Sequence, residues 1–195
     1  MRRFAVVGHR AATSPDFPLD DLPGSAGRLD ILARCANAAF VRSHGVRTDA
    51  EITLVLQGPP RPPRTLRLVG EHLRFLNPDE RSTAARFRKA LEYDGILEKE
   101  ISPGIFASGE DFTAAVRRLS PPYVLEPTGT DIRRAPLNDD ATFFLSDHED
   151  LTAAERATVD EFGGMPLSVG PVSLHADQVI TLIHNELDRR AARDG

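Results

Sequence analysis

The amino-acid sequence predicts a single α/β domain with a largely parallel sheet. Short apolar runs of strand length alternate along the chain with longer stretches whose apolar residues recur at helical spacing. A chain of 195 residues is long enough for one domain that buries roughly 70% of the surface its unfolded form exposes. Neither an internal repeat nor a low-complexity tract interrupts the chain, so the domain is expected to span 1–195.

The N-terminal half is expected to hold alternating strands and helices. Its apolar patterns place strands at 3–7, 52–56, 65–69 and 72–76 and helices at 29–43 and 78–94. Gly45 is expected to end the first helix, and Gly70 to turn the third strand back into the fourth. Asn77 as N-cap, followed by Pro78 at the first helical position, opens the second helix. The connection at 10–27 is longer than the roughly 12–15 residues of ordinary loops, which makes it a candidate lid or binding loop.

From residue 101 onward strands and helices continue to alternate. The expected elements are strands at 105–106, 123–125, 142–145 and 166–169 and helices at 110–119, from 150, and at 174–190. The last strand runs into Gly170 and Pro171, and Ser, His, Ala and Asp precede the final helix. A plain connection needs only a turn residue and a cap, so this composition indicates either a ligand or a tight backbone passage by Gly170.

Composition and missing motifs exclude several classes of function. The one cysteine, Cys35, has no partner for a disulfide or a zinc site, which indicates a reducing, cytoplasmic compartment. No apolar stretch approaches the roughly 18 residues of a membrane span, and no signal peptide is expected. The histidines lack metal-ligand spacing, so no metal is expected. Phosphate-binding glycine loops and the nucleophile elbow are missing, and the adjacent Ser146, Asp147 and His148 cannot converge as a triad.

Positive charge is concentrated in the N-terminal half. Residues 1–90 contain 15 Lys and Arg against 9 Asp and Glu, and residues 91–195 contain 9 against 20, so the formal charges are +6 and −11. Of the 24 basic residues 22 are Arg, whose planar fork suits phosphates and base stacking. One interpretation is that residues 1–95 face RNA. The alternative is that Arg usage reflects genome base composition and that the acidic half is simply a solvated surface, and composition alone leaves it open.

Polar or glycine-rich sequences follow three expected strands, at 125–129, 145–148 and 168–173. Ligands of open α/β sheets bind at the carboxyl ends of strands, so these three ends are expected to form one pocket. "FFLSDHEDLTAAE" at 143–155 and "LSVGPVSLHADQVITLIHNELD" at 167–188 cover two of them. These motifs resemble the C-terminal half of SPOUT-superfamily RNA methyltransferases, in which the last loops form a deep trefoil knot around S-adenosylmethionine.

The resemblance extends to the first half of the chain. "GRLDILARCANAAFVRSHGVRTDAEITLVLQGPP" at 27–60 with "LNPDERSTAARFRKAL" at 76–91 looks like the archaeal tRNA (pseudouridine-54 N1)-methyltransferase family. It implies a SPOUT-like, mostly parallel sheet with helices on both faces and a cofactor-binding knot at about 120–190. It also implies methylation of N1 of pseudouridine in the T loop of tRNA. Ser146, where relatives are expected to have Gly, and Gln178, where Cys is common, depart from the family pattern.

The resemblance also implies a set of functional residues. Those expected to hold S-adenosylmethionine, largely through backbone groups, are Leu125, Ser146, Leu167, Ser168, Val169, Gly170, Pro171, Val172, Ser173 and Leu174. Arg28 and Asp30 match an Arg-x-Asp element of the related ribosomal enzyme. Asp30 would orient the base edge or accept its proton, and Arg28 would stabilise negative charge or hold a phosphate. An ordinary helix N-terminus, at which Asp30 favours the dipole, is the alternative.

The partners implied by the resemblance are tRNA and a second copy of the chain. Arg10, Arg81 and Arg86 are the candidates for contact with phosphates. Members of the superfamily are generally homodimers, and the apolar face of the last helix is available for that contact or for the core: Val179, Leu182, Ile183 and Leu187. The alternatives that remain are methylation of rRNA pseudouridine or of a ribose 2′-hydroxyl, and a non-catalytic RNA-binding module.

Overall fold

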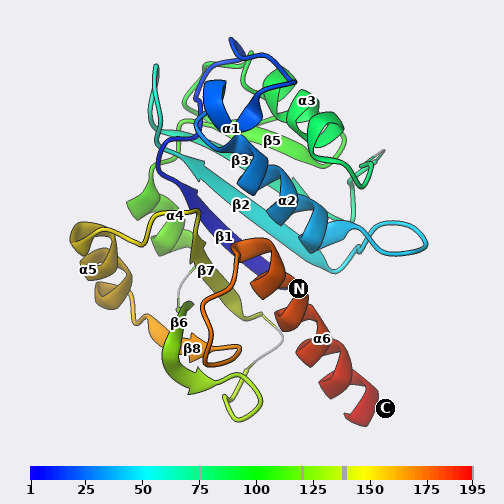
Figure 1. Ribbon diagram of the computed structural model, residues 1–195, viewed down its shortest axis with the longest axis vertical. Helices are drawn as coiled ribbons and strands as arrows, with labels where there is room; N and C mark the ends of the chain where they lie inside the picture. The colour runs from blue at the N-terminus through cyan, green and yellow to red at the C-terminus, as the bar shows by residue number, and fades with distance from the viewer. Residues whose placement is uncertain (75, 120, 138–139, 195) are drawn as a thin grey trace.

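Eight strands form one mixed sheet within the residues that the computed structural model describes, 1–74, 76–119, 121–137 and 140–194 (Figure 1). The sheet order is β4-β5-β3-β2-β1-β7-β6-β8. The strands are β1 (Arg2–Gly8), β2 (Ala50–Leu56), β3 (Arg64–Val69), β4 (Lys99–Ser102), β5 (Ile105–Ser108), β6 (Pro122–Asp131), β7 (Thr142–Ser146) and β8 (Met165–Ser168). The helices are α1 (Leu22–Ser25), α2 (Leu29–Phe40), α3 (Glu80–Ala90), α4 (Phe112–Arg118), α5 (Ala153–Glu161) and α6 (Ala176–Asp194).

The part of the sheet that includes the C-terminal strands is parallel. β1 pairs in parallel with β2 and β7, and β6 pairs in parallel with β7 and β8. β3, β5 and β4 extend the sheet through antiparallel pairs. The carboxyl ends of β1, β6, β7 and β8 therefore meet at one edge, where the pocket is predicted.

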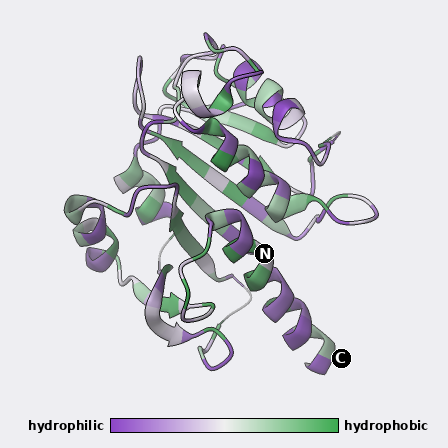
Figure 2. Ribbon diagram, viewed as in Figure 1, coloured by the Kyte–Doolittle hydropathy of each residue, from purple (hydrophilic) through white to green (hydrophobic). Residues whose placement is uncertain are grey.

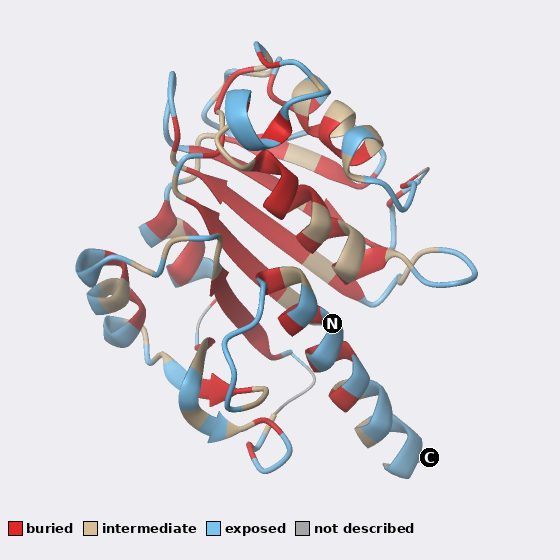
Figure 3. Cartoon of the chain, viewed as in Figure 1, coloured by how far each residue is buried: buried red, intermediate tan, exposed pale blue. Residues whose placement is uncertain are grey.

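Helices cover both faces of the sheet, as predicted. In β1, Phe4 and Val6 pack in the core layer of α2, α3 and α6, whereas Ala5 and Val7 pack in the layer of α4 and α5, because successive strand residues point to opposite faces. Figures 2 and 3 show the central strands as hydrophobic and buried. Among the residues described, no helix is long and apolar enough to cross a membrane.

Two expected N-terminal elements are corrected by the structure. Residues 72–74 and 76 form no strand, and residue 75 lies outside the described residues. The edge of β3 that this strand would need is already paired with β5. Helix α3 begins at Glu80 rather than at Pro78, because Asp79 is the N-cap and its carboxylate accepts the Ser82 N–H at 2.8 Å.

The segments around α2 also differ from expectation. α2 ends at Phe40, and Gly45 adopts a φ of +81° in the turn that lets Val41 pair with Val46. The long connection at 10–27 includes α1 and packs into the core, where Ala11 and Phe17 are buried. It is therefore a packed part of the domain rather than a lid.

The chain crosses β8 at Gly129. Leu125 and Thr130, both in β6, each pair with Leu167 of β8. A strand residue has one neighbour on each side, so segment 126–129 passes across β8. A Cβ on Gly129 would lie 2.5 Å from the Leu167 nitrogen and 2.7 Å from the Pro166 carbonyl carbon, so the two backbones touch.

This crossing corrects the expectation about Gly170. Among the described residues, no atom outside Gly170 and its two chain neighbours lies within 4 Å of the position that a Cβ on Gly170 would occupy, and its φ is not among the positive values. A tight backbone passage does exist, but it lies at Gly129 of β6, which contacts Leu167 of β8 although the two residues are far apart in the sequence. A crossing of this kind is what a knotted chain requires; the knot itself stays a prediction.

Candidate functional site

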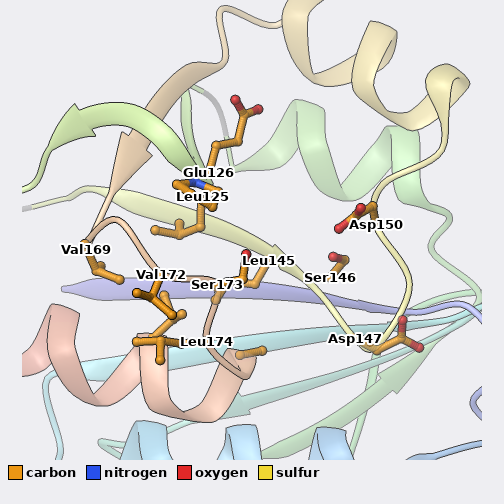
Figure 4. A pocket seen from close by; sticks show the side chains of 14 residues that line it. Leu125, Glu126, Leu145, Ser146, Asp147, Asp150, Val169, Val172, Ser173 and Leu174 are labelled. Atoms are coloured by element: carbon orange, nitrogen blue, oxygen red, sulfur yellow. The ribbon is translucent and has the colours of Figure 1, made fainter.

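A cavity of about 160 Å³ opens at the carboxyl end of β7 and along residues 125–127 of β6, beside the loop that follows β8 and the start of α6. Figure 4 shows Leu125 and Leu145 at its base, with Val169, Val172 and Leu174 toward α6 and Asp150 on the loop after β7. A second cavity of about 330 Å³ shares lining residues with it and reaches Arg156 of α5. The three strand ends singled out from the sequence therefore do converge.

Seven of the ten residues predicted to hold a cofactor line the first cavity: Leu125, Ser146, Val169, Gly170, Val172, Ser173 and Leu174. The other three do not. Leu167 is fully buried in the sheet, Ser168 is buried beneath the loop, and Pro171 is exposed. Leu167 and Ser168 are the buried last residues of β8, whereas Pro171 lies in the loop after it, so a continuous stretch of sequence does not separate lining residues from buried or exposed neighbours.

Ser168 shapes the loop that forms one wall of the cavity. Its hydroxyl accepts the Gly170 N–H at 3.2 Å and lies 2.9 Å from the Gly170 carbonyl oxygen and 3.1 Å from that of Pro127. These contacts join the loop after β8 to the end of β6. Ser168 therefore affects the cavity indirectly, because its hydroxyl fixes the loop backbone that forms the cavity wall.

Three carboxylate residues that sequence reasoning missed also line the cavity: Glu126, Asp147 and Asp150. Asp147 follows β7 directly and Asp150 lies in the same loop, so the rule that ligands bind at strand ends was the available signal. With the leucine and valine side chains they give the cavity an apolar wall and an acidic wall, in which Glu126 is paired with Arg156 and Asp147 with His9. No group of three or more side chains able to hold a metal ion occurs in the part of the chain that is described.

Arg28 and Asp30, the predicted catalytic pair, lie at the first turn of α2. The Arg28 guanidinium donates from Nε and Nη2 to the two Asp30 carboxylate oxygens, at 3.0 and 3.1 Å, and Arg34 donates to the same carboxylate at 2.9 Å. Burial raises the pKa of Asp30, but the hydrogen bonds from both guanidinium groups outweigh it and lower the pKa below its ordinary value. Asp30 therefore anchors Arg28 and is poorly suited to take up a proton.

Arg28 occupies a strained position near the cavity. Its φ is 66°, and it is the one non-glycine residue with positive φ among those described. The hydrogen bond to Asp30 is the main cause that raises the pKa of Arg28, and the negative charge of Asp147 adds to it. Arg28 thus lies within electrostatic reach of the acidic cavity wall. An ordinary helix N-terminus needs neither the strain nor the bidentate ion pair.

The three arginines predicted to contact RNA do not form one cluster. Arg10 follows β1 and pairs with Glu149. Arg81 lies in a surface groove of α2, α3 and α6 that also includes Arg34 and Asp177. Arg86 is half-buried, and five residues along a helix place it about 140° around α3 from Arg81.

Tertiary ion pairs reduce the charge asymmetry that the sequence displays. Arg2 and Arg47, both in the basic half, bind Asp188 of α6 at 2.7 and 2.8 Å. Arg67 pairs with Glu98 at 2.7 Å. The formal +6 of residues 1–90 is therefore partly neutralised by the acidic half, and fewer arginines remain for a polyanion.

Comparisons with known proteins agree with this geometry. A family model described as "Putative SAM-dependent RNA methyltransferase" matches residues 1–192. The tRNA (pseudouridine(54)-N(1))-methyltransferase of Methanocella arvoryzae is 47% identical over 97% of this chain and 100% of its own length. The proteins of the same name from Methanosarcina acetivorans and Halobacterium salinarum are 43% and 44% identical, over 100% and 96% of this chain and 94% and 96% of their own.

A solved structure shares the fold. The crystal structure of Archaeoglobus fulgidus Nep1 bound to S-adenosylhomocysteine superposes with a TM-score of 0.67 at 13% sequence identity, over 98% of this chain and 99% of that one. At this identity the likeness concerns the fold alone, and it confirms the SPOUT-like architecture that the sequence predicts.

Proposed function

Since the chain belongs to the SAM-dependent RNA methyltransferase family whose model matches residues 1–192, we propose that it transfers a methyl group from S-adenosylmethionine to N1 of pseudouridine at position 54 in the T loop of tRNA. The observation that carries the proposal is full-length identity of 43–47% to archaeal enzymes of that name. The convergence of the three strand ends on one cavity supports it independently.

The cavity suits S-adenosylmethionine chemically. The leucine and valine wall provides apolar contact for the adenosine part, and the loop after β8 offers backbone groups that can hydrogen-bond the adenine. Asp150 lines the cavity as an exposed residue, and its carboxylate favours a ligand that carries a sulfonium and an ammonium group. We propose that the seven lining residues predicted from the sequence contact the cofactor and that Ser168 holds their loop.

When bound, the cofactor supplies an electrophilic methyl carbon on a positively charged sulfur. N1 of the target base bears a proton, so its attack on this carbon requires loss of the proton and stabilisation of the negative charge that spreads over the ring. Arg28, held by Asp30, is proposed to stabilise that charge at a carbonyl oxygen of the base. The proton leaves to solvent, because the ion pairs of Asp30 keep its carboxylate a weak base.

The direct test is incubation of the protein with tRNA and methyl-labelled S-adenosylmethionine, followed by mass spectrometry of the nucleosides. We expect label in N1-methylpseudouridine. Label in a 2′-O-methylated nucleoside would instead assign the enzyme to a ribose-methylating branch, and transfer to rRNA alone would change the substrate. Failure to bind the cofactor in calorimetry would favour a non-catalytic RNA-binding module.

Residues 1–95 are proposed to face tRNA and residues 120–190 to bind the cofactor. Replacing both Arg81 and Arg86 with Ala is expected to weaken tRNA binding and to reduce the slope of log K against log salt by roughly one unit per lost phosphate contact. The single variants Arg81→Ala and Arg86→Ala show which side of α3 contacts RNA, because the two residues lie on different sides of the helix. Unchanged affinity for S-adenosylmethionine is the control, and a double variant with the wild-type slope would mean that α3 faces away from RNA.

A homodimer is part of the proposal, although α6 offers less surface for it than the sequence suggests. Val179 and Ile183 are buried in the core of the same chain, whereas Leu182 is 39% exposed. Leu182→Glu is expected to lower the mass measured by light scattering from that of a dimer to that of a monomer, because it places a charge in an apolar contact. Leu97→Glu, at an exposed leucine away from α6, is the matched control. A dimeric Leu182→Glu protein would contradict this interface.

The cytoplasmic location expected from Cys35 is likewise part of the proposal. Cys35 is fully buried as a free thiol in α2. A free buried cysteine is typical of proteins that fold in reducing compartments.

A further inference from the structure

His9 lies directly after β1 with its imidazole between two carboxylates. Nδ1 is 2.9 Å from Asp147 Oδ1, and Nε2 is 3.1 Å from Glu155 Oε2. All three side chains are buried, with exposed fractions of 9% for His9, 1% for Asp147 and 9% for Glu155. A neutral imidazole can donate from one ring nitrogen only, so this geometry requires the imidazolium form.

The pKa of His9 agrees with this arrangement. The hydrogen bond to Asp147 is the largest cause, burial opposes it, and Glu155 adds to the rise, so that the pKa increases from its ordinary 6.5 to about 9. Further side chains at these carboxylates include Gln57, which donates to Glu155 at 2.9 Å, and His148, which lies 3.4 Å from Asp147. The positive charge of Arg28 also acts on Asp147.

The two carboxylates mark the ends of the loop between β7 and α5. At its start, Asp147 accepts the N–H of His9 at 2.9 Å and that of Glu149 at 3.0 Å. At its end, Glu155 accepts the N–H and the hydroxyl of Thr152 at 2.8 and 2.9 Å, as the N3 residue of a capping box. One imidazolium therefore connects both ends of the loop to β1.

The same loop forms the acidic wall of the cofactor cavity. Ser146, Asp147 and Asp150 line the cavity, and Figure 4 shows them along this segment. We propose that His9 is a positioning residue: its cation, shared by Asp147 and Glu155, holds loop 146–152 in the shape that binds S-adenosylmethionine. This inference rests on the proposed function and adds a residue that does not itself line the cavity.

The charge of His9 distinguishes the proposed positioning role from a role in packing alone. His9, Asp147 and Glu155 together carry a net charge of −1, and His9→Gln changes it to −2 with two buried carboxylates left facing each other. Glu155→Gln in the same chain restores −1 and keeps a residue that can complete the capping box. His44→Gln, at an exposed histidine in the turn after α2, is the matched control.

The experiment measures the affinity for S-adenosylmethionine by calorimetry and the hydrogen exchange of amides 146–152 in the free protein, at pH 7.5. We expect His9→Gln to raise Kd about tenfold, as for loss of one buried charged hydrogen bond, and to speed exchange in the loop. The double variant should recover most of both effects, His44→Gln should show neither, and circular dichroism should report a folded protein throughout.

The pH profile gives a second readout. The folded protein holds the His9 proton up to about pH 9, whereas the unfolded chain releases it near 6.5. The contribution of His9 is therefore complete below pH 6.5 and is lost as the pH rises through about 9. Cofactor affinity of the wild type should fall over that upper range, and that of His9→Gln should not.

Each outcome discriminates. Wild-type affinity and exchange in His9→Gln overturn the proposal, and so does a double variant as impaired as the single one, since that result indicates packing alone. A wild-type protein that binds no S-adenosylmethionine overturns the proposed function instead. The exchange measurement on the free protein then still decides whether His9 holds the loop.

Discussion

A tRNA transcript with uridine at position 54 is expected to stay unmethylated by this protein, whereas the matched transcript with pseudouridine at that position is expected to be converted to N1-methylpseudouridine. The reason is chemical. In uridine N1 is bonded to the ribose, so no lone pair and no N–H are available there, while the C-glycoside leaves N1 free on an exposed edge. The expected difference in rate is all or none.

The two transcripts differ in one glycosidic bond, so they serve as each other's control for tRNA binding. Nucleoside mass spectrometry after incubation with labelled S-adenosylmethionine measures the product, and filter binding measures affinity. The base must leave its stack in either transcript before the methyl group can reach it, so comparable affinities are expected. Methylation of the uridine transcript would defeat the assignment of N1 as the acceptor.

Gly129→Val unfolds the protein or lowers its free energy of unfolding by at least about 3 kcal/mol. The added Cβ would lie 2.5 Å from the backbone nitrogen of Leu167, and backbone atoms of a paired strand cannot move aside as a flexible side chain would. The crossing of β6 over β8 would have to open. Urea denaturation monitored by circular dichroism measures the change.

Gly170→Val is the matched control for this substitution. In the described part of the chain, no atom beyond its own chain neighbours lies within 4 Å of its Cβ position, so the fold should be retained with nearly unchanged stability. Because Gly170 lines the cavity, the valine side chain should still weaken S-adenosylmethionine binding in calorimetry. Equal stability of Gly129→Val and Gly170→Val would mean that Gly129 does not lie against the backbone of β8.

The sequence by itself determined the class of the fold and the edge that holds the site. The apolar runs of β1, β2, β7 and β8 and the helical repeat of α6 are local signals, because backbone geometry sets their periods. From them follow the alternation of elements and the meeting of three strand ends. Seven of the cofactor residues predicted there line the cavity.

Only the tertiary structure decided which backbones touch and which charges meet. Gly129 and Leu167 are distant in sequence, as are His9 and Asp147, and nothing in the neighbouring residues of either marks the partner. The same holds for Arg2 and Asp188, whose ion pair removes positive charge that a count of residues assigns to an RNA-binding surface. The physical reason is that periodicity is a property of adjacent residues, whereas close approach, burial and ion pairing depend on how separate segments are packed.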